Sequence, residues 1–248
     1  MTQDTLSTFI CDDESAGLAK SQQHQWQSPG KVNHMSQLLR VQNFVVSLDG
    51  FGAGDGQSLE RPFGHANPGE LMYWAGATAS WPNRTDPGGT RGLDDYFTRD
   101  FKNNIGAEIM GAHKFSPHRG PWENLDWQGW WGDEPPFHTP VFVLTHHLRP
   151  SFTLSDTTFH FTDDEPAAVL EAAKEAAQGK DVRLGGGATV IREFIEADLV
   201  DTLHVVVAPV ELGSGVPLWK SPEELTDRFN LEIVPSASGV THHIFWKK

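Results

Sequence analysis

The chain has 248 residues and carries 19 Lys and Arg against 33 Asp and Glu, which gives a formal net charge of -14. A charge of this sign disfavours binding to nucleic acid and to anionic membranes, although a phosphorylated ligand responds to the local field. The single cysteine, Cys11, excludes a disulfide framework, and no apolar run approaches the ~20 residues of a membrane span. We therefore expect a cytoplasmic protein that binds a small-molecule substrate, without a nucleic-acid or membrane partner.

The first part of the chain, residues 1–37, is polar, rich in Gln, Ser and Asp, and without sustained periodicity. Such a segment cannot bury enough apolar surface to offset the entropy that is lost on ordering. We predict a flexible N-terminal tail over residues 1–37, followed by one domain over residues 38–248.

The domain opens with an apolar run at residues 41–48, which predicts a central strand. The run leads into a glycine-rich loop at residues 47–56, which is typical either of a mobile flap at a sheet end or of a long surface hairpin. Apolar residues at helical spacing predict helices over residues 70–79 and 93–104, and residues 105–110 predict a short buried strand.

Residues 116–140 hold four tryptophans among prolines and glycines, namely Trp122, Trp127, Trp130 and Trp131. The segment is too long for a plain connection, so one interpretation is a lid or a dimer surface. The other interpretation is a small satellite core beneath a long loop.

Further strands follow in the second half of the chain. Apolar and β-branched runs predict strands over residues 141–145, 158–161, 182–184 and before Pro209, and a C-terminal hairpin over residues 229–246. Helices separate them, because one helix opens at Pro166 and ends before Gly179, and an amphipathic one follows Gly187. We predict an α/β domain with a mostly parallel central sheet, flanking helices and an antiparallel C-terminal hairpin at one edge.

Three consecutive glycines, Gly185, Gly186 and Gly187, join a predicted strand to a predicted helix. Glycines let the backbone approach a ligand closely, and a helix start presents unpaired N–H groups that suit a phosphate. A tight turn without any ligand is the alternative. The spacing excludes both the Gly-x-Gly-x-x-Gly and the Gly-x4-Gly-Lys-Ser/Thr motifs.

Four stretches carry a resemblance to a known family: Val45-Val46-Ser47-Leu48-Asp49-Gly50, Met110-Gly111, residues 140–145 and residues 184–215. In this order and at this spacing, they resemble the dihydrofolate-reductase-like fold. The nearest relatives are the reductase domain of the bifunctional riboflavin-biosynthesis deaminase-reductase and its single-domain cousins. The resemblance extends over residues 38–246, and the chain holds no zinc-deaminase motif.

The resemblance implies an NADPH-dependent reductase that forms a homodimer and passes hydride to a pterin- or pyrimidine-like molecule, as in riboflavin biosynthesis or folate reduction. The phosphate bridge nearest the nicotinamide would contact Gly185, Gly186, Gly187, Ala188 and Thr189. A second phosphate turn and the adenosine ribose with its 2′-phosphate would contact Gly111, Ala112, His113, Lys114, Thr145, His146 and His147. Because Ala112 stands where the family often has arginine, Lys114, His113 or His147 would have to supply the positive charge.

Asp49 lies beside the predicted nicotinamide pocket and is the candidate for a catalytic contact with the substrate; the alternative is an Asp-Gly turn residue. No metal site is predicted, because adjacent histidines such as His242 and His243 point to opposite faces of a strand. A rival function is a non-catalytic module that binds a nucleotide or a protein partner through the Trp-rich segment. Binding of NADPH without turnover would favour that rival.

Overall fold

A computed structural model describes residues 36–82 and 84–248 of the chain. The predicted tail over residues 1–37 therefore lies outside the described residues, apart from its last two. Gln37 is one of these, and its Nε2 donates hydrogen bonds of 2.8 Å to the carbonyls of Lys174 and Lys180.

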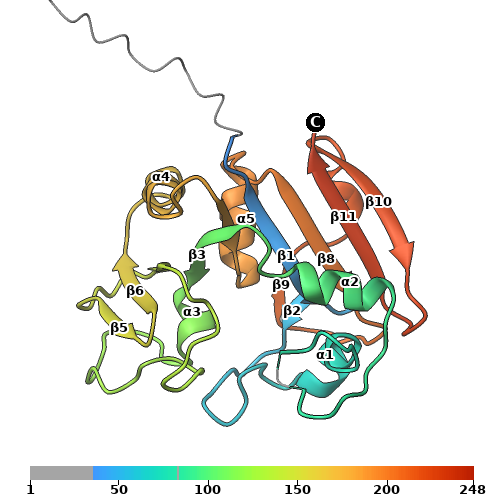
Figure 1. The fold of residues 1–248 in the computed structure, drawn as a ribbon, viewed down its shortest axis with the longest axis horizontal. Helices are drawn as coiled ribbons and strands as arrows, with labels where there is room; N and C mark the ends of the chain where they lie inside the picture. Colours follow the sequence, from blue (N-terminus) through green and yellow to red (C-terminus); the bar gives the residue numbers. More distant parts are fainter. Residues whose placement is uncertain (1–35, 83) are drawn as a thin grey trace, which may run out of the picture. The chain divides into compact units, whose positions relative to one another are not determined.

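Nine strands of this described part form one sheet in the order β10-β11-β8-β1-β7-β3-β4-β6-β5 (Figure 1). Their bounds are β1 Leu39–Val46, β3 Ile105–Gly111, β4 Val141–Leu144, β5 Phe152–Leu154, β6 Thr157–Thr162, β7 Asp181–Leu184, β8 Thr202–Val207, β10 Phe229–Pro235 and β11 Thr241–Lys247. Two shorter strands, β2 (Phe51–Ala53) and β9 (Val216–Pro217), pair with each other.

The sheet is parallel through its centre and antiparallel at both edges. The pairs β1–β7, β1–β8, β3–β7, β3–β4 and β4–β6 are parallel, whereas β8–β11, β10–β11 and β5–β6 are antiparallel. This confirms the predicted α/β fold with its C-terminal antiparallel hairpin. The short strand β5, which adds the second antiparallel edge, was not predicted.

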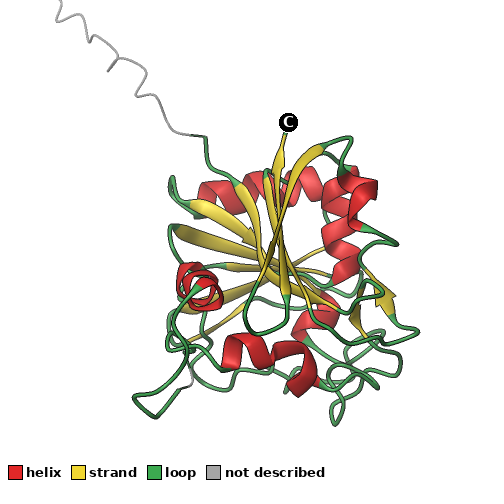
Figure 2. Ribbon diagram, turned by 90° about the vertical axis from the view of Figure 1, so that its right-hand side faces the viewer, coloured by secondary structure: helices red, strands yellow, loops and turns green. Residues whose placement is uncertain are grey.

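Helices cover both faces of the sheet (Figure 2). They are α1 Pro68–Gly76, α2 Leu93–Asp100, α3 Ala112–Phe115, α4 Pro166–Ala176, α5 Ala188–Glu196 and the 3₁₀ helix η1 Pro222–Leu225. Core residues of α4 and α5 pack on one face, and those of α1 pack on the other. Among the residues described, no helix is long and apolar enough to cross a membrane.

The helix bounds follow from local sequence chemistry. Asn67 caps α1 by accepting a hydrogen bond of 2.9 Å from Gly69 N, and Pro68 occupies the first helical position. In α5, Ile191, Phe194 and Ile195 recur at helical spacing and are all buried. The predicted helices are thus present, with ends that differ by a few residues. The single turn α3 is too short to have a periodicity that the sequence could reveal.

A bulge in β1 shapes the centre of the molecule. The pairing register of β1 with β8 shifts between Val41 and Phe44, and Asn43 has a φ of 55°. Beyond the bulge, the Phe44 ring packs against two glycines that leave no room for a side chain. A Cβ atom would lie 2.9 Å from the ring at Gly52 and 2.8 Å from it at Gly186. Phe44 therefore holds the start of the flap against the glycine turn.

On the face of the sheet that α1 covers, buried polar side chains form a hydrogen-bonded chain. His204 Nε2 lies 2.9 Å from His242 Nδ1, and His242 Nε2 lies 2.8 Å from Asp94 Oδ1. The Phe97 ring stacks on both imidazoles, with centroids 3.9 and 4.7 Å away. His243, the next residue, packs against Trp219 instead. The two adjacent histidines therefore do point to opposite faces of β11.

The Trp-rich segment forms a satellite core. Trp122, Trp127 and Trp131 pack against a buried cluster that contains Phe115 and Phe159. Trp127 Nε1 donates a hydrogen bond of 2.9 Å to Phe115 O, which closes the segment onto α3. Of the two interpretations of residues 116–140, the satellite core therefore describes these three tryptophans.

Candidate functional site

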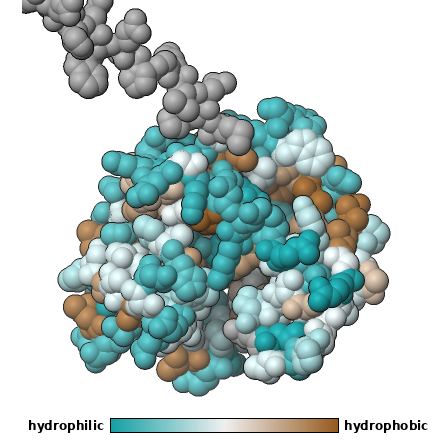
Figure 3. Space-filling view, in the orientation of Figure 1, coloured by the Kyte–Doolittle hydropathy of each residue, from teal (hydrophilic) through white to brown (hydrophobic). Residues whose placement is uncertain are grey.

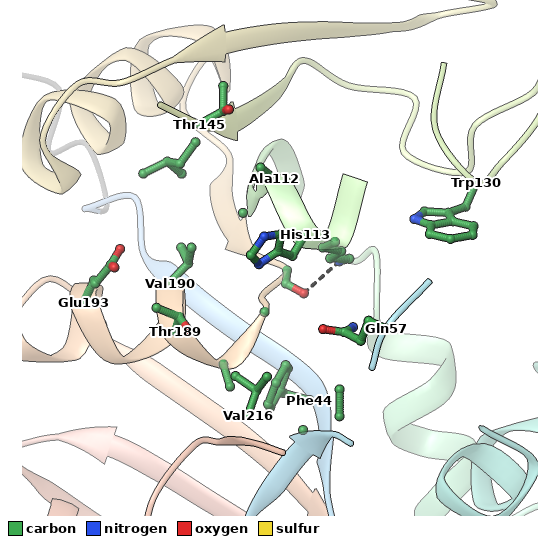
Figure 4. Close-up of a pocket in the computed structure, with 18 of the residues that line it drawn as sticks. Phe44, Gln57, Ala112, His113, Trp130, Thr145, Thr189, Val190, Glu193 and Val216 are labelled. Carbon is green, nitrogen blue, oxygen red and sulfur yellow. Dashed lines mark hydrogen bonds between the residues drawn. The ribbon is translucent and has the colours of Figure 1, made fainter. Parts of the chain in front are cut away.

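A cavity of about 1230 Å³ opens where the carboxyl ends of the central strands meet. Phe44 of β1, Gly111 of β3 and Leu144 of β4 contribute to its walls, together with the turn that follows β7. Figure 4 shows it running from Glu193 and Thr145, past the His113 ring, to Gln57 and Trp130. On the face drawn in Figure 3, the surface is mostly hydrophilic and is hollowed near its middle. A ligand site at strand C-termini is the arrangement expected of open α/β sheets.

The cavity brings together nearly all of the predicted cofactor-binding residues. Those that line it are Gly111, Ala112, His113, Lys114, Thr145, His146, His147, Gly185, Gly187, Ala188 and Thr189. Gly186 is the exception. Its φ is +102°, and the Phe44 ring occupies the space that a side chain would need. Gly186 is therefore required by the shape of the turn, and its N-terminal and C-terminal neighbours are the residues that face the cavity.

The start of α5 presents unpaired N–H groups to the cavity. Gly187 is the N-cap residue, no side chain caps the helix, and no acidic residue lies in its first turn. A Cβ atom at Gly187 would have no neighbour within 4 Å among the described atoms. Ala188 and Thr189 follow, and both line the cavity. This open, uncapped helix start has the donors and the room that a pyrophosphate needs, so the residues fit the cofactor that the resemblance implies.

Beneath the glycine turn lies a buried group of three charges. Glu108 of β3 and Arg183 of β7 are cross-strand partners, and Arg183 Nη2 lies 2.6 Å from Glu108 Oε2. Lys114 Nζ lies 3.2 Å from Glu108 Oε1 and donates a hydrogen bond of 2.7 Å to Gly185 O. Burial alone would raise the pKa of the Glu108 carboxyl, but Arg183 and Lys114 outweigh it and lower that pKa. Glu108 is therefore ionised and doubly paired.

Asp49, the residue predicted to contact the substrate, lies at a junction between two loops. It is not among the residues that line the cavity. Its carboxylate accepts hydrogen bonds from Leu212 N at 3.1 Å, Gly213 N at 2.6 Å and Ser47 Oγ at 2.5 Å. Partial burial would raise the pKa of Asp49, but these hydrogen bonds lower it overall. The structure thus favours the turn interpretation of Asp49, in which it ties the flap to the loop after β8.

The end of the cavity between β4 and β6 carries both histidines and acids. His147 is held by its backbone: its N–H donates to Thr145 Oγ1 at 3.1 Å, and its carbonyl accepts from Trp122 Nε1 at 2.6 Å. Asp164 follows β6, the strand that pairs with β4, and it accepts a hydrogen bond of 2.6 Å from Thr162 Oγ1. The sequence indicated the acidic residues 163–165 only as a helix start, although they also line this end.

Several other lining residues were not predicted. Phe44, Gln57, Arg119 and Trp130 all face the cavity. Gln57 directly follows the glycine-rich loop and Trp130 lies in the Trp-rich segment, so both regions were recognisable, but nothing in the sequence singled out these positions. Over residues 36–82 and 84–248, the structure has no group of three or more His, Cys, Asp or Glu side chains that could hold a metal ion.

Comparisons with known proteins agree with this geometry. Residues 41–239 match the RibD C-terminal domain family. Over 99 residues, the chain is 32% identical to the uncharacterised protein YwjB of Bacillus subtilis (strain 168), covering 38% of this chain and 55% of that protein. Over 70 residues, it is 39% identical to the uncharacterised protein YyaP of the same organism, covering 27% and 36%. The chain thus spans about half or less of the length of the curated relatives that it matches.

Among solved structures, a protein of Shewanella sp. PV-4 named for riboflavin biosynthesis superposes with a TM-score of 0.51 at 18% identity. The superposition covers 85% of this chain and 99% of that one, which supports a shared fold. The sheet order, the flanking helices and the antiparallel C-terminal strands are those of the dihydrofolate-reductase-like α/β fold that the resemblance implies. Because the family match extends over most of the chain, this protein belongs to the RibD C-terminal domain family.

Proposed function

We propose that the protein is an NADPH-dependent reductase that transfers hydride to a pterin- or pyrimidine-like small molecule. Members of its family typically bind NADPH. The observation that carries the proposal is the uncapped start of α5, which opens beside the glycine turn into a cavity at the strand ends. The cavity volume of about 1230 Å³ exceeds the roughly 300–1,000 Å³ of most single-ligand sites, so a dinucleotide and a second molecule have room together.

In this proposal, the protein binds, orients and shields, while the bound cofactor supplies the hydride. The N–H groups of Gly187, Ala188 and Thr189 would hold the pyrophosphate. His113, Thr145, His146 and His147 would contact the adenosine ribose and its 2′-phosphate. Phe44 and the flap would form the floor and wall where the nicotinamide meets the substrate, and the substrate would extend toward Gln57 and Trp130.

The proposal is tested by placing a carboxylate at the start of α5. Thr189→Asp should weaken NADPH binding by at least tenfold, about 1.4 kcal/mol, because an anion would face the pyrophosphate. The same change should leave the melting temperature unchanged or raise it, because an acidic residue in a first helical turn interacts favourably with the helix dipole. Thr189 is exposed, so the substitution disturbs no packing. NADPH titration followed by tryptophan fluorescence measures the affinity.

Thr189→Asn is the matched control, because it has nearly the shape of Asp without the charge and should change the affinity little. If Asp and Asn bind NADPH as tightly as the parent, the helix start is no phosphate site and the proposal fails. Turnover is then followed by NADPH absorbance with dihydrofolate, the phosphoribosylamino-pyrimidine and simple carbonyl compounds. Tight NADPH binding without turnover of any of them would favour a non-catalytic nucleotide-binding module.

A further inference from the structure

We propose that Lys114 is the lysine that binds the pyrophosphate of the cofactor, locked in position by Glu108 and Arg183, and that it has no part in recognising the 2′-phosphate. This inference rests on the proposed function and deepens it. A lysine could bind either the pyrophosphate or the 2′-phosphate, and the inference assigns Lys114 to the pyrophosphate alone.

The position of the Lys114 ammonium is the first argument. Nζ donates to the carbonyl of Gly185, the first residue of the glycine turn, at 2.7 Å. The end of β3 is tied to the same turn, because Gly111 N donates a hydrogen bond of 2.8 Å to Gly186 O. Two hydrogen bonds therefore hold the β3–α3 corner against the β7–α5 corner. The ammonium lies at this junction, against Gly185, which precedes the N-cap residue Gly187 by two positions.

The donor count is the second argument. A lysine ammonium has three donors and no acceptor. Two of them are engaged, one by Gly185 O and one by Glu108 Oε1 at 3.2 Å. Lys114 also lines the cavity, and its side chain is 28% exposed. Among the described residues, the third donor has no partner, and the other two donors fix the direction of the side chain.

The local charge is the third argument. Glu108 carries one negative charge against the positive charges of Lys114 and Arg183, so the group as a whole bears one net positive charge. Glu108 and Arg183 are only 2% and 4% exposed, and the Arg183 guanidinium lies 3.9 Å from the Phe101 ring centroid. A charge held among buried groups is screened less than one at the surface, so it attracts an anion at the turn more strongly.

Glu108 also explains why Lys114 cannot serve the 2′-phosphate. To reach the adenosine end, the ammonium would have to leave Gly185 and give up its pairing with a fully buried carboxylate. Breaking such a pair leaves a buried charge less compensated, which is strongly unfavourable. Glu108 is thus a positioning residue, and Lys114 is the residue that touches the ligand.

The test compares NADPH and NADH binding to two Lys114 variants by tryptophan fluorescence. Lys114→Met removes the charge and the turn contact, and Lys114→Gln removes the charge while its amide can still donate to Gly185 O. Both should weaken NADPH and NADH by at least tenfold each, with the ratio of the two affinities unchanged. Inorganic pyrophosphate should compete with NADH in the parent and compete at least tenfold more weakly in both variants. Both variants should lose stability because Glu108 loses one partner, but Glu108 keeps Arg183, so both should still fold, and affinities are titrated well below their melting temperatures.

Lys102→Met is the matched control. Lys102 is an exposed lysine close enough to influence Glu108 and Arg183, yet it is not among the residues lining the cavity, so removing its charge should change neither affinity by more than about twofold. A loss confined to NADPH would overturn the inference in favour of the 2′-phosphate. Full affinity in Lys114→Gln would overturn it in favour of a purely structural lysine. If the parent itself binds neither dinucleotide, the proposed function has failed, which is a separate outcome.

Discussion

Single polar residues hold the loops around the cavity in place, and Asp49 is the clearest of them. It joins the flap after β1 to the loop after β8 through two backbone amides that lie 163 and 164 residues further along the chain. An ionised carboxylate can accept both hydrogen bonds at once, whereas an amide side chain offers a single oxygen. The junction between the two loops therefore depends on the ionised carboxylate of Asp49.

Asp49→Asn should lower the free energy of unfolding by about 1 to 3 kcal/mol, because one amide of the loop loses its charged acceptor. The dissociation constant of NADPH should stay within about twofold of the parent value, because Asp49 does not line the cavity. Urea unfolding and NADPH titration measure the two quantities. Asp55→Asn is the control, because among the described residues the Asp55 carboxylate accepts a single hydrogen bond, from the exposed Ser214 hydroxyl. A large loss of turnover at unchanged stability would instead restore Asp49 as a catalytic residue.

At the scale of elements, the Trp-rich segment depends on one arginine. Arg149 Nη1 donates to Trp127 O at 2.7 Å, and Arg149 Nη2 donates to Leu125 O at 2.9 Å. Its guanidinium also lies 5.0 Å from the Trp122 ring centroid and 5.0 Å from that of Phe152. Because the segment has no strand or helix of its own, these contacts replace the hydrogen bonds that a regular element would provide.

Arg149→Leu should lower the free energy of unfolding by about 2 to 4 kcal/mol, because two charge-assisted hydrogen bonds and the cation–π contacts are lost together. Chemical denaturation measures the change. Arg119→Leu serves as the control, since Arg119 is exposed in the same segment and should change stability by no more than about 0.5 kcal/mol. Equal losses in the two variants would mean that Arg149 does not hold the segment.

The elements themselves could be predicted from the sequence, because a strand or a helix is written in local periodicity. The glycine turn and the helix after it were recognisable for the same reason. Glu108 was not, since a glutamate inside an apolar strand has no local explanation. Its partner Arg183 lies 75 residues away and becomes its neighbour only through the pairing of β3 with β7. The role of Lys114 depends on that pairing, so it too lay beyond what spacing could reveal.

The same limit applied to Asp49 and to the end of the cavity between β4 and β6. Asp49 was predicted to contact the substrate because it lies beside the predicted nicotinamide pocket, and the amides that donate to it come from the far half of the chain. Asp164 was predicted from its place before a helix, which is a local property, but that it lines the same cavity as His147 depends on the pairing of β4 with β6. Sequence patterns therefore located the loops of the site more reliably than the roles of their side chains.

At the scale of the whole molecule, the buried histidines link stability to pH. Burial, together with the neighbouring imidazoles of His242 and His243, holds the pKa of His204 well below its usual range. Burial also lowers the pKa of His242, although the Asp94 carboxylate opposes it. An unfolded histidine takes up a proton near pH 6.5. Below that pH, the unfolded chain binds protons that the folded chain does not, so the folded state loses stability as the pH falls.

The free energy of unfolding should therefore decrease between pH 7.5 and pH 5, by up to about 1.4 kcal/mol per pH unit for each such histidine. Carboxylates titrate mainly below this window, so the histidines dominate it. Denaturant unfolding at several pH values measures the slope. His204→Gln should reduce the slope by roughly 1 kcal/mol per pH unit. An unchanged slope in that variant would show that the pH dependence has another source.

Homodimer formation stays a prediction at this scale.

The order of the strands in the sheet has a consequence for folding during synthesis on the ribosome. Of the strands that the structure describes, β1 leaves the ribosome first, whereas its neighbours β7 and β8 follow only in the last third of the chain. Leu38 N donates to Asp181, 143 residues later, and Leu39 N donates to Asp201, 162 residues later. At roughly 5–20 residues per second, synthesis leaves β1 without either neighbour for roughly 7 to 30 s. During that time its apolar side chains and free edges invite association with other nascent chains. A chaperone that binds short apolar strands would meet this polypeptide at β1, long before there is any cavity to fill.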